Sequence, residues 1–460
     1  MLSREQCHEI FERVRKYTSV DEVDVLISGG ENALTRFANN TITQNVADET
    51  YDISVRVAFD GRTARASTNK TDNESLRKVV SQAEALARVQ ESDPDLLPMA
   101  TAREAGNGES PNRFFEETAA MGPMERAERA SQMVSVAKRI NLTAAGVVAS
   151  GQQVDAIFNS RGVAAYNVRT HAEASITMIA ADSSGWQKAN APDVRQVDTQ
   201  RLAEVAAEKA RDSAQPKEIA PGKYTVILEP AAVLDLVGFM FWDFSGLALL
   251  EQRSFLTNRM ETRLFGENIS ISDDVRHPLQ SGPGFDGEGV RRQSVELVDK
   301  GVVQRVVFSR ASAALARKQG DGKLGTIQTT GHGFPLPNEM GEAPMNVVFT
   351  APEKESTRTI EQMVTGTERG ILVTRLWYIR EVEPYEKLLT GMTRDGTFWV
   401  EDGRVRHGLR NFRFNQSLVE LLQNVLEMSE PVRASGEESF DMVVPAMKVN
   451  GFNFTEVTRF

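Results

Sequence analysis

The sequence has little cysteine and histidine, the side chains that most often hold transition metals or start covalent catalysis. Among 460 residues there is one cysteine, Cys7, so no disulfide can form within the chain. Such a chain fits the reducing cytoplasm best. There are five histidines, and no two have the spacing that places paired ligands on one helix face. The sequence therefore excludes a zinc site of the H-E-x-x-H type.

Positive charge is also scarce. Lysine and arginine number 53 against 64 acidic residues, which gives a net charge of −11 and a pI near 5.3. This balance disfavours broad attraction to nucleic acid or anionic lipid. The stretch "RVRHGLRNFRF" (404–414) interleaves arginine with phenylalanine, which can stack bases, but an ordinary strand with one solvated face explains it better. We expect neither a nucleic-acid nor a membrane partner.

Common catalytic and nucleotide-binding signatures are missing as well. The sequence has no G-x-S-x-G nucleophile elbow. Residues 282–287, "GPGFDG", match G-x-G-x-x-G, but a histidine-proline loop precedes them and a hairpin pattern follows. A phosphate loop needs a strand before it and a helix after it. No nucleotide site is indicated.

One nearly apolar run is present, "LDLVGFMFWDFSGLALL" at 234–250. A membrane-spanning helix needs about 20 largely apolar residues without central charge, and Asp235 and Asp243 break this one. At ~100° per residue, Met240 and Phe244 fall on one face, whereas Asp235, Trp242 and Asp243 fall on the other. We predict a two-faced helix packed on a soluble core. The amphipathic first 17 residues predict a helix, and a signal peptide is not expected.

Local patterns predict an α+β fold. Helical and strand-like runs mix without a regular strand–helix repeat. The strongest expected helix is 72–90, capped by Asp72 or Asn73, and another spans 199–213, capped by Thr199. A late helix is expected over 415–430.

Turn residues predict the hairpins and one boundary. Tight turns are expected at 39–40, 60–61, 299–301 and 401–403. Residues 214–223, "AQPKEIAPGK", carry two prolines and a glycine and mark the expected boundary. It separates an N-terminal domain of mixed helices and strands (1–213) from a strand-rich C-terminal domain (224–460).

The remaining candidates for chemistry are isolated residues. His332 lies in "TTGHGFP", where glycines allow close approach to a ligand, although a turn histidine is the simpler interpretation. Cys7 and His8 are neighbours that point apart on a helix. The carboxylates at 272–274 and 286–289 could hold a hard cation, but solvated loop acids explain them better. From the residues alone, no catalytic set emerges.

Three separated stretches nevertheless resemble one family. They are "RFANNTITQN" with the following "DISVRVAFDGRTARAST", then "GFDGEGVRRQSVELVDKGVVQRVVFSR", and then the region 374–418 with its "TGMTRDGTF" run. In this order they are similar to the TldD/PmbA (TldE) family. The resemblance implies an interlocked α+β fold of the TldD/PmbA type and a cytoplasmic dimer. It also implies a peptidase in which a metal-bearing TldD subunit pairs with a TldE subunit. An older label of the family is modulator of DNA gyrase.

The family's metal helix, H-E-x-x-x-H, falls near residues 235–250, where this chain has no histidine. The cysteine that the family supplies near its C-terminus is also missing. The resemblance therefore implies a metal-free, TldE-like member that binds no cofactor itself, with zinc only in a TldD-like partner. The "TGMTRDGTF" run is closer to the TldD version, so a third branch stays open.

The leading hypothesis is a non-catalytic subunit that pairs with a TldD-like chain, or with itself, on extended, unfolded peptides. One alternative is a peptidase that uses an unrecognised site, and a second is a regulatory or binding protein without a peptidase partner. No catalytic residue and no metal ligand is assigned. For substrate binding we expect Thr390, Thr393, Arg394 and Asp395, with Arg394 orienting a peptide carboxylate or carbonyl; a structural turn with an Arg–Asp pair is the simpler alternative.

Overall fold

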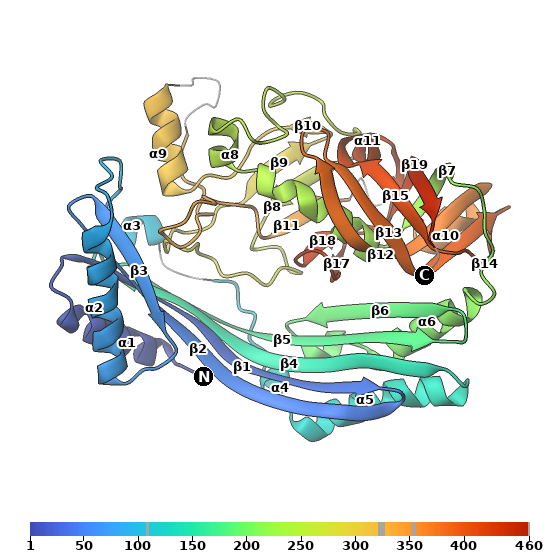
Figure 1. Cartoon of the computed structure of the whole chain (residues 1–460), viewed down its shortest axis with the longest axis horizontal. Coiled ribbons are helices and arrows are strands. Elements are labelled where there is room, and N and C mark those ends of the chain that lie inside the picture. Colours follow the sequence, from blue (N-terminus) through green and yellow to red (C-terminus); the bar gives the residue numbers. More distant parts are fainter. Residues whose placement is uncertain (107–109, 321–326, 352–355, 459–460) are drawn as a thin grey trace.

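The first half of the chain forms one long, twisted antiparallel sheet (Figure 1). The computed structural model describes residues 1–106, 110–320, 327–351 and 356–458. The strand order is β3-β2-β1-β4-β5-β6, and all neighbours are antiparallel. The strands are β1 (Glu22–Ala38), β2 (Thr41–Phe59), β3 (Arg62–Thr68), β4 (Thr143–Asn159), β5 (Ala164–Ile179) and β6 (Ser184–Ala191).

Two pairs of helices bury opposite ends of this sheet. The helices α1 (Arg4–Tyr17) and α2 (Asn73–Val89) cover one end, and α5 (Pro123–Arg139) and α6 (Thr199–Asp212) cover the other. Each helix presents an apolar stripe to the strands, so each end has its own hydrophobic core. The short helices α3 (Ala102–Ala105) and α4 (Glu116–Ala119) and the 3₁₀ helix η1 (Val194–Gln196) lie in the connections.

The second half contains a small sheet in the order β10-β9-β8-β11-β18-β17. Its core is shared with the third sheet, so the two sheets form one packed unit. The strands are β8 (Ser270–Asp273), β9 (Val295–Asp299), β10 (Val302–Val303), β11 (Val347–Thr350), β17 (Val432–Ala434) and β18 (Met442–Val444). Helix α9 (Arg310–Gln319) follows β10.

The third sheet closes on itself. Its order is β12-β7-β19-β15-β13-β14, and β12 also pairs with β13, so five of the strands form a ring. Buried phenylalanines fill part of its interior, Phe412, Phe414, Phe452 and Phe454. The strands are β7 (Gly222–Leu228), β12 (Arg369–Glu383), β13 (Leu388–Glu401), β14 (Arg404–Gly408), β15 (Phe412–Ser417) and β19 (Met447–Val457); β16 (Val425–Met428) pairs with β19. Helices α10 (Ile360–Thr365) and α11 (Leu418–Gln423) lie beside it.

The structure confirms the α+β class and the expected hairpin turns. Asp72 caps α2 as predicted, but α6 is capped by Asp198, whose carboxylate accepts from Arg201 N, and not by Thr199. The prediction of a late helix over 415–430 is wrong in length, because α11 covers only Leu418–Gln423. It ends at Gln423 because Val425–Met428 pairs with β19 as strand β16. The domain boundary at 214–223 stays a prediction.

The two halves of the chain form two layers (Figure 1). Strand β6 is the edge strand of the first sheet that lies nearest the closed third sheet, which we call the barrel. Ser184 Oγ of β6 donates to Asp395 Oδ1 of β13 at 2.6 Å, and Asn190 Nδ2 donates to Asp441 Oδ2 at 2.6 Å. Within the described residues, no helix is both long and apolar enough to cross a membrane.

Candidate functional site

The segment 234–250 is broken into three short elements and is not the single two-faced helix expected. These are α7 (Pro230–Val237), the 3₁₀ helix η2 (Gly238–Asp243) and α8 (Gly246–Leu250). A Cβ on Gly238 would lie 1.9 Å from the hydroxyl of Ser439. The backbone at Gly238 is therefore packed closely against residues 436–439, which we call the C-terminal segment. Ser245 then starts α8 by accepting from Ala248 N. The break buries both aspartates and leaves Trp242 46% exposed.

Asp235 is the polar group that α7 turns toward the C-terminal segment. It is fully buried, and its Oδ1 accepts from the N–H groups of Glu437 at 3.1 Å and Glu438 at 3.0 Å. Its Oδ2 is buried without a hydrogen-bond partner in the described structure. Burial raises the pKa of Asp235 to about 7, and the two N–H groups oppose this rise. Near neutral pH this carboxyl is therefore divided between its two protonation states.

Asp243 is held in a buried ion pair. Lys387 Nζ lies 2.5 Å from its Oδ2, and Phe255 N donates to its Oδ1 at 3.2 Å. Burial raises the pKa of Asp243, and the Lys387 charge opposes that effect. Lys387 also contacts Glu381 at 2.7 Å. Asp243 thus anchors η2 to the β12–β13 hairpin and is not open to a ligand.

These residues do not fit a zinc ion. A zinc site needs three or four nitrogen, sulfur or oxygen donors arranged around one point. In the parts of the chain that the structure describes, no group of three or more His, Cys, Asp or Glu could hold a metal. At α7 the uncommitted donor is a single oxygen of Asp235, and the neighbouring Phe241 and Phe244 are packed in the core.

Two of the expected peptide-binding residues support neighbouring strands. Thr390 Oγ1 donates to the Phe414 carbonyl at 3.1 Å. Thr393 is 2% exposed, and its Oγ1 accepts from Phe412 N at 3.0 Å. Both hydroxyls therefore fasten β13 to β15.

Arg394 and Asp395 lie in a cluster with a residue that sequence reasoning missed, Arg375. Arg375 Nε donates to Asp395 Oδ2 at 2.9 Å, and the Arg375 guanidinium lies 4.6 Å from the centre of the Trp186 ring. Arg394 stacks over Trp377 at 4.7 Å, and its side chain is 45% exposed. Of the four expected residues, Arg394 is the one with a substantially exposed side chain. No local signal marks Arg375, because its partners come from other strands.

Polar contacts join β6 to the segment 436–437 next to Asp235. Lys188 contacts Glu173 at 3.4 Å and Glu437 at 4.0 Å, and it donates to the Gly436 carbonyl at 3.3 Å. Burial raises the pKa of Glu173, against the charge of Lys188. The two halves of the chain are thus joined by charged side chains beside α7.

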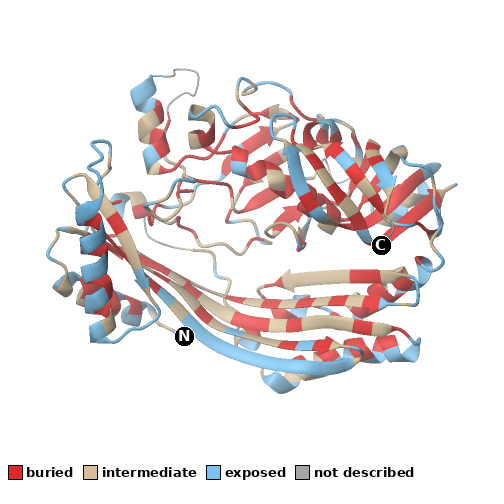
Figure 2. Cartoon of the chain, in the orientation of Figure 1, coloured by how far each residue is buried: buried red, intermediate tan, exposed pale blue. Residues whose placement is uncertain are grey.

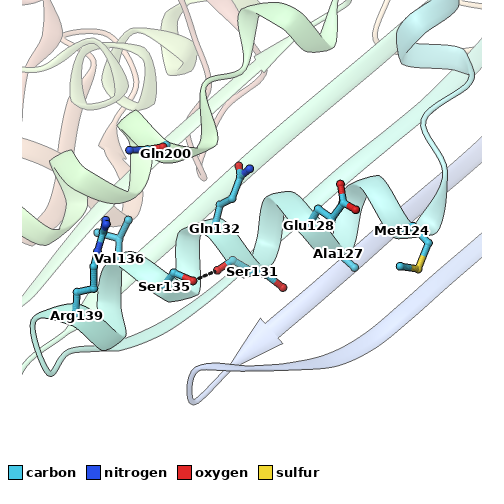
Figure 3. A pocket seen from close by; sticks show the side chains of 9 residues that line it. All are labelled: Met124, Ala127, Glu128, Ser131, Gln132, Ser135, Val136, Arg139 and Gln200. Carbon is cyan, nitrogen blue, oxygen red and sulfur yellow. Dashed lines mark hydrogen bonds between the residues drawn. The ribbon is translucent and has the colours of Figure 1, made fainter.

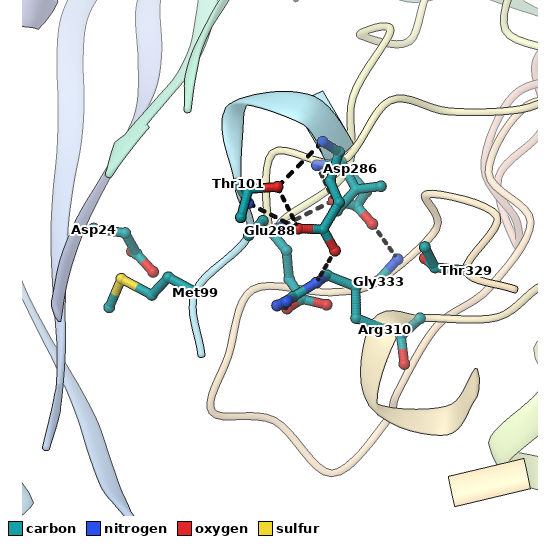
Figure 4. A network of polar contacts seen from close by, with 12 residues as sticks. Asp24, Met99, Thr101, Asp286, Glu288, Arg310, Thr329 and Gly333 are labelled. Atoms are coloured by element: carbon teal, nitrogen blue, oxygen red, sulfur yellow. Dashed lines mark hydrogen bonds and ion pairs between the residues drawn. The ribbon is translucent and has the colours of Figure 1, made fainter. Parts of the chain in front are cut away.

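The acidic loop 286–289 is a buried junction and not a solvated cation loop (Figure 4). Asp286 accepts from Glu288 N at 2.9 Å and from Gly333 N at 2.8 Å. Glu288 pairs with Arg310 at 3.2 Å, and Arg310 pairs with Glu104 at 2.8 Å. Burial, together with the Glu288 charge, raises the pKa of Asp286 to about 7. These carboxylates fasten three distant segments together.

The isolated candidates are core residues. His332 is 1% exposed, and its ring nitrogens lie 2.9 Å from Asp273 Oδ1 and 2.9 Å from Thr330 Oγ1. Both nitrogens are therefore engaged and removed from solvent. Cys7 is fully buried, and burial raises the pKa of its thiol to about 11, which keeps it in the unreactive thiol form.

Surface hollows lie on both halves of the described chain. Two adjoining hollows of about 380 and 740 Å³ share Leu247 and Asn338, and the ring of Trp242, which lines the larger one, lies 5.9 Å from that of Phe334. A groove of about 550 Å³ follows α5 to Gln200, at the start of α6 (Figure 3). Serine, glutamine and apolar side chains dominate its wall.

Comparisons with known proteins agree with this architecture. Models of the PmbA/TldA metallopeptidase domain 1, central domain and C-terminal domain match residues 23–87, 111–214 and 221–456. The metalloprotease PmbA of Escherichia coli O157:H7 is 23% identical over 416 residues, which cover 87% of this chain and 85% of that protein.

Solved structures share the fold. TldE from Thermococcus kodakarensis superposes with a TM-score of 0.84 at 18% identity, over 98% of this chain and 100% of that one. A Thermotoga maritima protein described as a candidate modulator of a DNA gyrase superposes with a TM-score of 0.80 at 19% identity, over 97% and 100%. Because the C-terminal model alone matches more than half of the residues, the chain belongs to the PmbA/TldA metallopeptidase family.

Proposed function

We propose that this chain is a non-catalytic subunit of a TldD-type peptidase complex that processes or degrades unfolded peptides. The proposal rests on the contacts of α7, the segment that the family resemblance matches to the metal helix. There a single carboxylate, Asp235, is buried against the backbone of 437–438. Zinc and its activated water would be supplied by a TldD-like partner.

The chemistry of amide hydrolysis supports the assignment of catalysis to the partner subunit. A hydrolytic zinc needs three protein ligands and an open position where water loses a proton. Asp235 can offer one oxygen, Asp243 is neutralised by Lys387, and His332 has both nitrogens engaged. None of the three can polarise a water for attack on a peptide bond.

The contribution of this chain to the complex is to help hold the substrate. An extended peptide can be bound through main-chain hydrogen bonds without its sequence being read. Among Thr390, Thr393, Arg394 and Asp395, we assign the direct contact to Arg394, whose exposed guanidinium suits a peptide carbonyl or carboxylate. Thr390, Thr393 and Asp395 position its strand. We place the complex in the cytoplasm, and we expect no contact with nucleic acid or membrane.

The test is reconstitution. The purified chain, a TldD-type subunit from the same organism and their mixture are each given zinc and an unstructured fluorogenic peptide. We expect cleavage in the mixture, none with this chain alone, and co-elution of the two subunits on size exclusion. A mixture made with a partner whose metal-ligand histidines are replaced by alanine should be inactive.

Two other outcomes would overturn the proposal. Zinc-dependent turnover by this chain alone, lost on chelation, would make it a peptidase with a site of its own. Failure to associate with any TldD-type subunit would instead favour a binding or regulatory protein without a peptidase partner.

A further inference from the structure

Helix α9 borders the smaller of the two adjoining hollows, which we call the α9 cavity. Its volume is about 380 Å³, within the range of about 300–1,000 Å³ that is typical of small-ligand sites. Its lining comes mainly from residues 93–97, from α9 with its cap, and from residues 334–341. Helix α9 combines buried and exposed residues (Figure 2). The cavity is therefore built by segments that lie far apart in the sequence.

The body of the α9 cavity is apolar. Its large apolar lining residues are each partly buried, and they are Leu96, Leu97, Leu247, Leu315, Phe334 and Leu336. Covering such side chains with another apolar group is favourable, because it removes their surface from water. The cavity therefore suits a ligand with an apolar body.

The carboxylate of Glu288 adds a buried charge to this apolar lining. Its side chain is 3% exposed. Its Oε2 accepts from Arg310 Nη1 at 3.2 Å (Figure 4), whereas its Oε1 has no hydrogen-bond donor in the part of the chain that the structure describes. A buried acceptor normally has a donor. A ligand that brings a donor to Oε1 would therefore complete the hydrogen bonding of this carboxylate.

Gly333 leaves Glu288 Oε1 free of a neighbouring side chain. A Cβ at position 333 would lie 3.0 Å from Glu288 Oε1 and 3.3 Å from Asp286 Oδ2. Any larger residue would therefore crowd both carboxylates. Glycine at this position keeps the approach to Oε1 open.

The charges around the α9 cavity favour a cation. The charged lining residues are three acids and one lysine, Asp93, Asp95, Glu288 and Lys318. Lys318 pairs with Asp95 at 2.7 Å, and Arg310, the partner of Glu288, also pairs with Glu104 at 2.8 Å. Both cations are thus shared with other acids, which leaves an excess of negative charge. An ammonium group has positive charge and three donors and no acceptor, so it matches Glu288 Oε1.

The larger hollow lets such a ligand continue beyond the α9 cavity. The two hollows share Leu247 and Asn338, and the larger one is lined by the exposed side chains of Trp242 and Met340. A ligand held at Glu288 can therefore extend along the surface toward Trp242. A peptide has this form, because its terminal amine lies next to one side chain and the chain continues from there.

We propose that the α9 cavity binds the free N-terminus of a peptide whose first residue is apolar. The ammonium group donates to Glu288 Oε1, the first side chain packs among the leucines, and the following residues extend toward Trp242. That the ligand is a peptide rests on the proposed function. The site itself lies within this chain, so its binding is measured without a partner subunit and without catalysis.

Isothermal titration calorimetry of the full chain at pH 7 tests the ligand. A peptide amine is largely protonated at this pH, since its pKa is about 7.7–8.0. We expect a tetrapeptide amide that begins with leucine to bind about tenfold more tightly than its N-acetylated form, which has lost the charge and the donors. The same peptide beginning with serine should also bind more weakly. The small amine 3-methylbutylamine, which has no peptide chain, should bind more weakly than the leucine peptide.

Two kinds of variant test the site. Glu288→Gln should weaken binding of the free-amine peptide about tenfold and leave the N-acetylated peptide unchanged, whereas Glu296→Gln, an exposed carboxylate on β9, is the matched control. Because Glu288 also pairs with Arg310, a second variant leaves that pair intact. Leu315→Trp fills the cavity and should abolish binding, whereas Leu315→Met, which conserves volume, should keep it.

Four outcomes would overturn the proposal. They are equal binding of the free and N-acetylated peptides, binding of 3-methylbutylamine as tight as that of the peptide, parent affinity in both Glu288→Gln and Leu315→Trp, and no binding of the leucine peptide. An inactive reconstituted complex together with intact, Glu288-dependent peptide binding would instead reject the proposed function and uphold this site.

Discussion

Replacing Asp235 by asparagine should stabilise the protein at high pH and less so at low pH. Burial raises the pKa of this carboxyl to about 7 in the folded chain, against about 3.9 in an unfolded one. The contribution of protonated Asp235 to the unfolding free energy is therefore fully present below pH ~4 and is lost as the pH rises toward 7. At about 1.4 kcal/mol per pKa unit, the parent loses roughly 4 kcal/mol of unfolding free energy over that range.

The Asp235→Asn variant keeps an oxygen for the N–H groups of Glu437 and Glu438 but has no proton to titrate. We expect it to exceed the parent in unfolding free energy by about 4 kcal/mol at pH 8 and by roughly 1.5 kcal/mol at pH 5. Urea unfolding followed by tryptophan fluorescence from pH 5 to 8 measures the difference. Asp21→Asn, at an exposed position, is the matched control. A difference that does not change with pH would refute the assignment of a buried, titrating carboxyl.

Three further outcomes are expected. Lys387→Met leaves Asp243 buried without its cation and should cost about 3–5 kcal/mol by denaturant unfolding, and adding Asp243→Leu should recover much of that loss. Arg394→Ala should change the unfolding free energy by less than about 0.5 kcal/mol yet raise KM for peptide in the reconstituted complex; an unchanged KM would remove Arg394 from the substrate contact. Zinc titration calorimetry of the pure chain should show no site tighter than non-specific binding, and one tight equivalent per chain would contradict the donor analysis at α7.

Local signals predicted the local structure. Asp72 caps α2 because a carboxylate before an amphipathic run accepts the first free N–H groups. The turn at 299–301 is a hairpin because Lys300 and Gly301 both adopt positive φ there. At α6 the same reasoning was one residue off, since Asp198 and Thr199 are adjacent and both can cap.

The features that the sequence did not reveal depend on distant segments. The pattern of 234–250 suits a continuous helix until Ser439, some 200 residues later, packs against Gly238. Asp235 is buried through the same segment, because the backbone N–H groups of 437–438 cover it. The Arg375–Asp395 pair joins strands that meet in the barrel and was not visible in local spacing. Family resemblance located the candidate site, but the contacts that fill it are tertiary.

The five-stranded ring has a consequence for how the protein is made. Its last strand, Met447–Val457, inserts between β7, which is more than 200 residues earlier, and β15. Because β19 follows both strands in the sequence, β7 and β15 are synthesised before the strand that pairs between them. A chain that stops before Met447 would therefore leave the facing edges of β7 and β15 unpaired and the ring open.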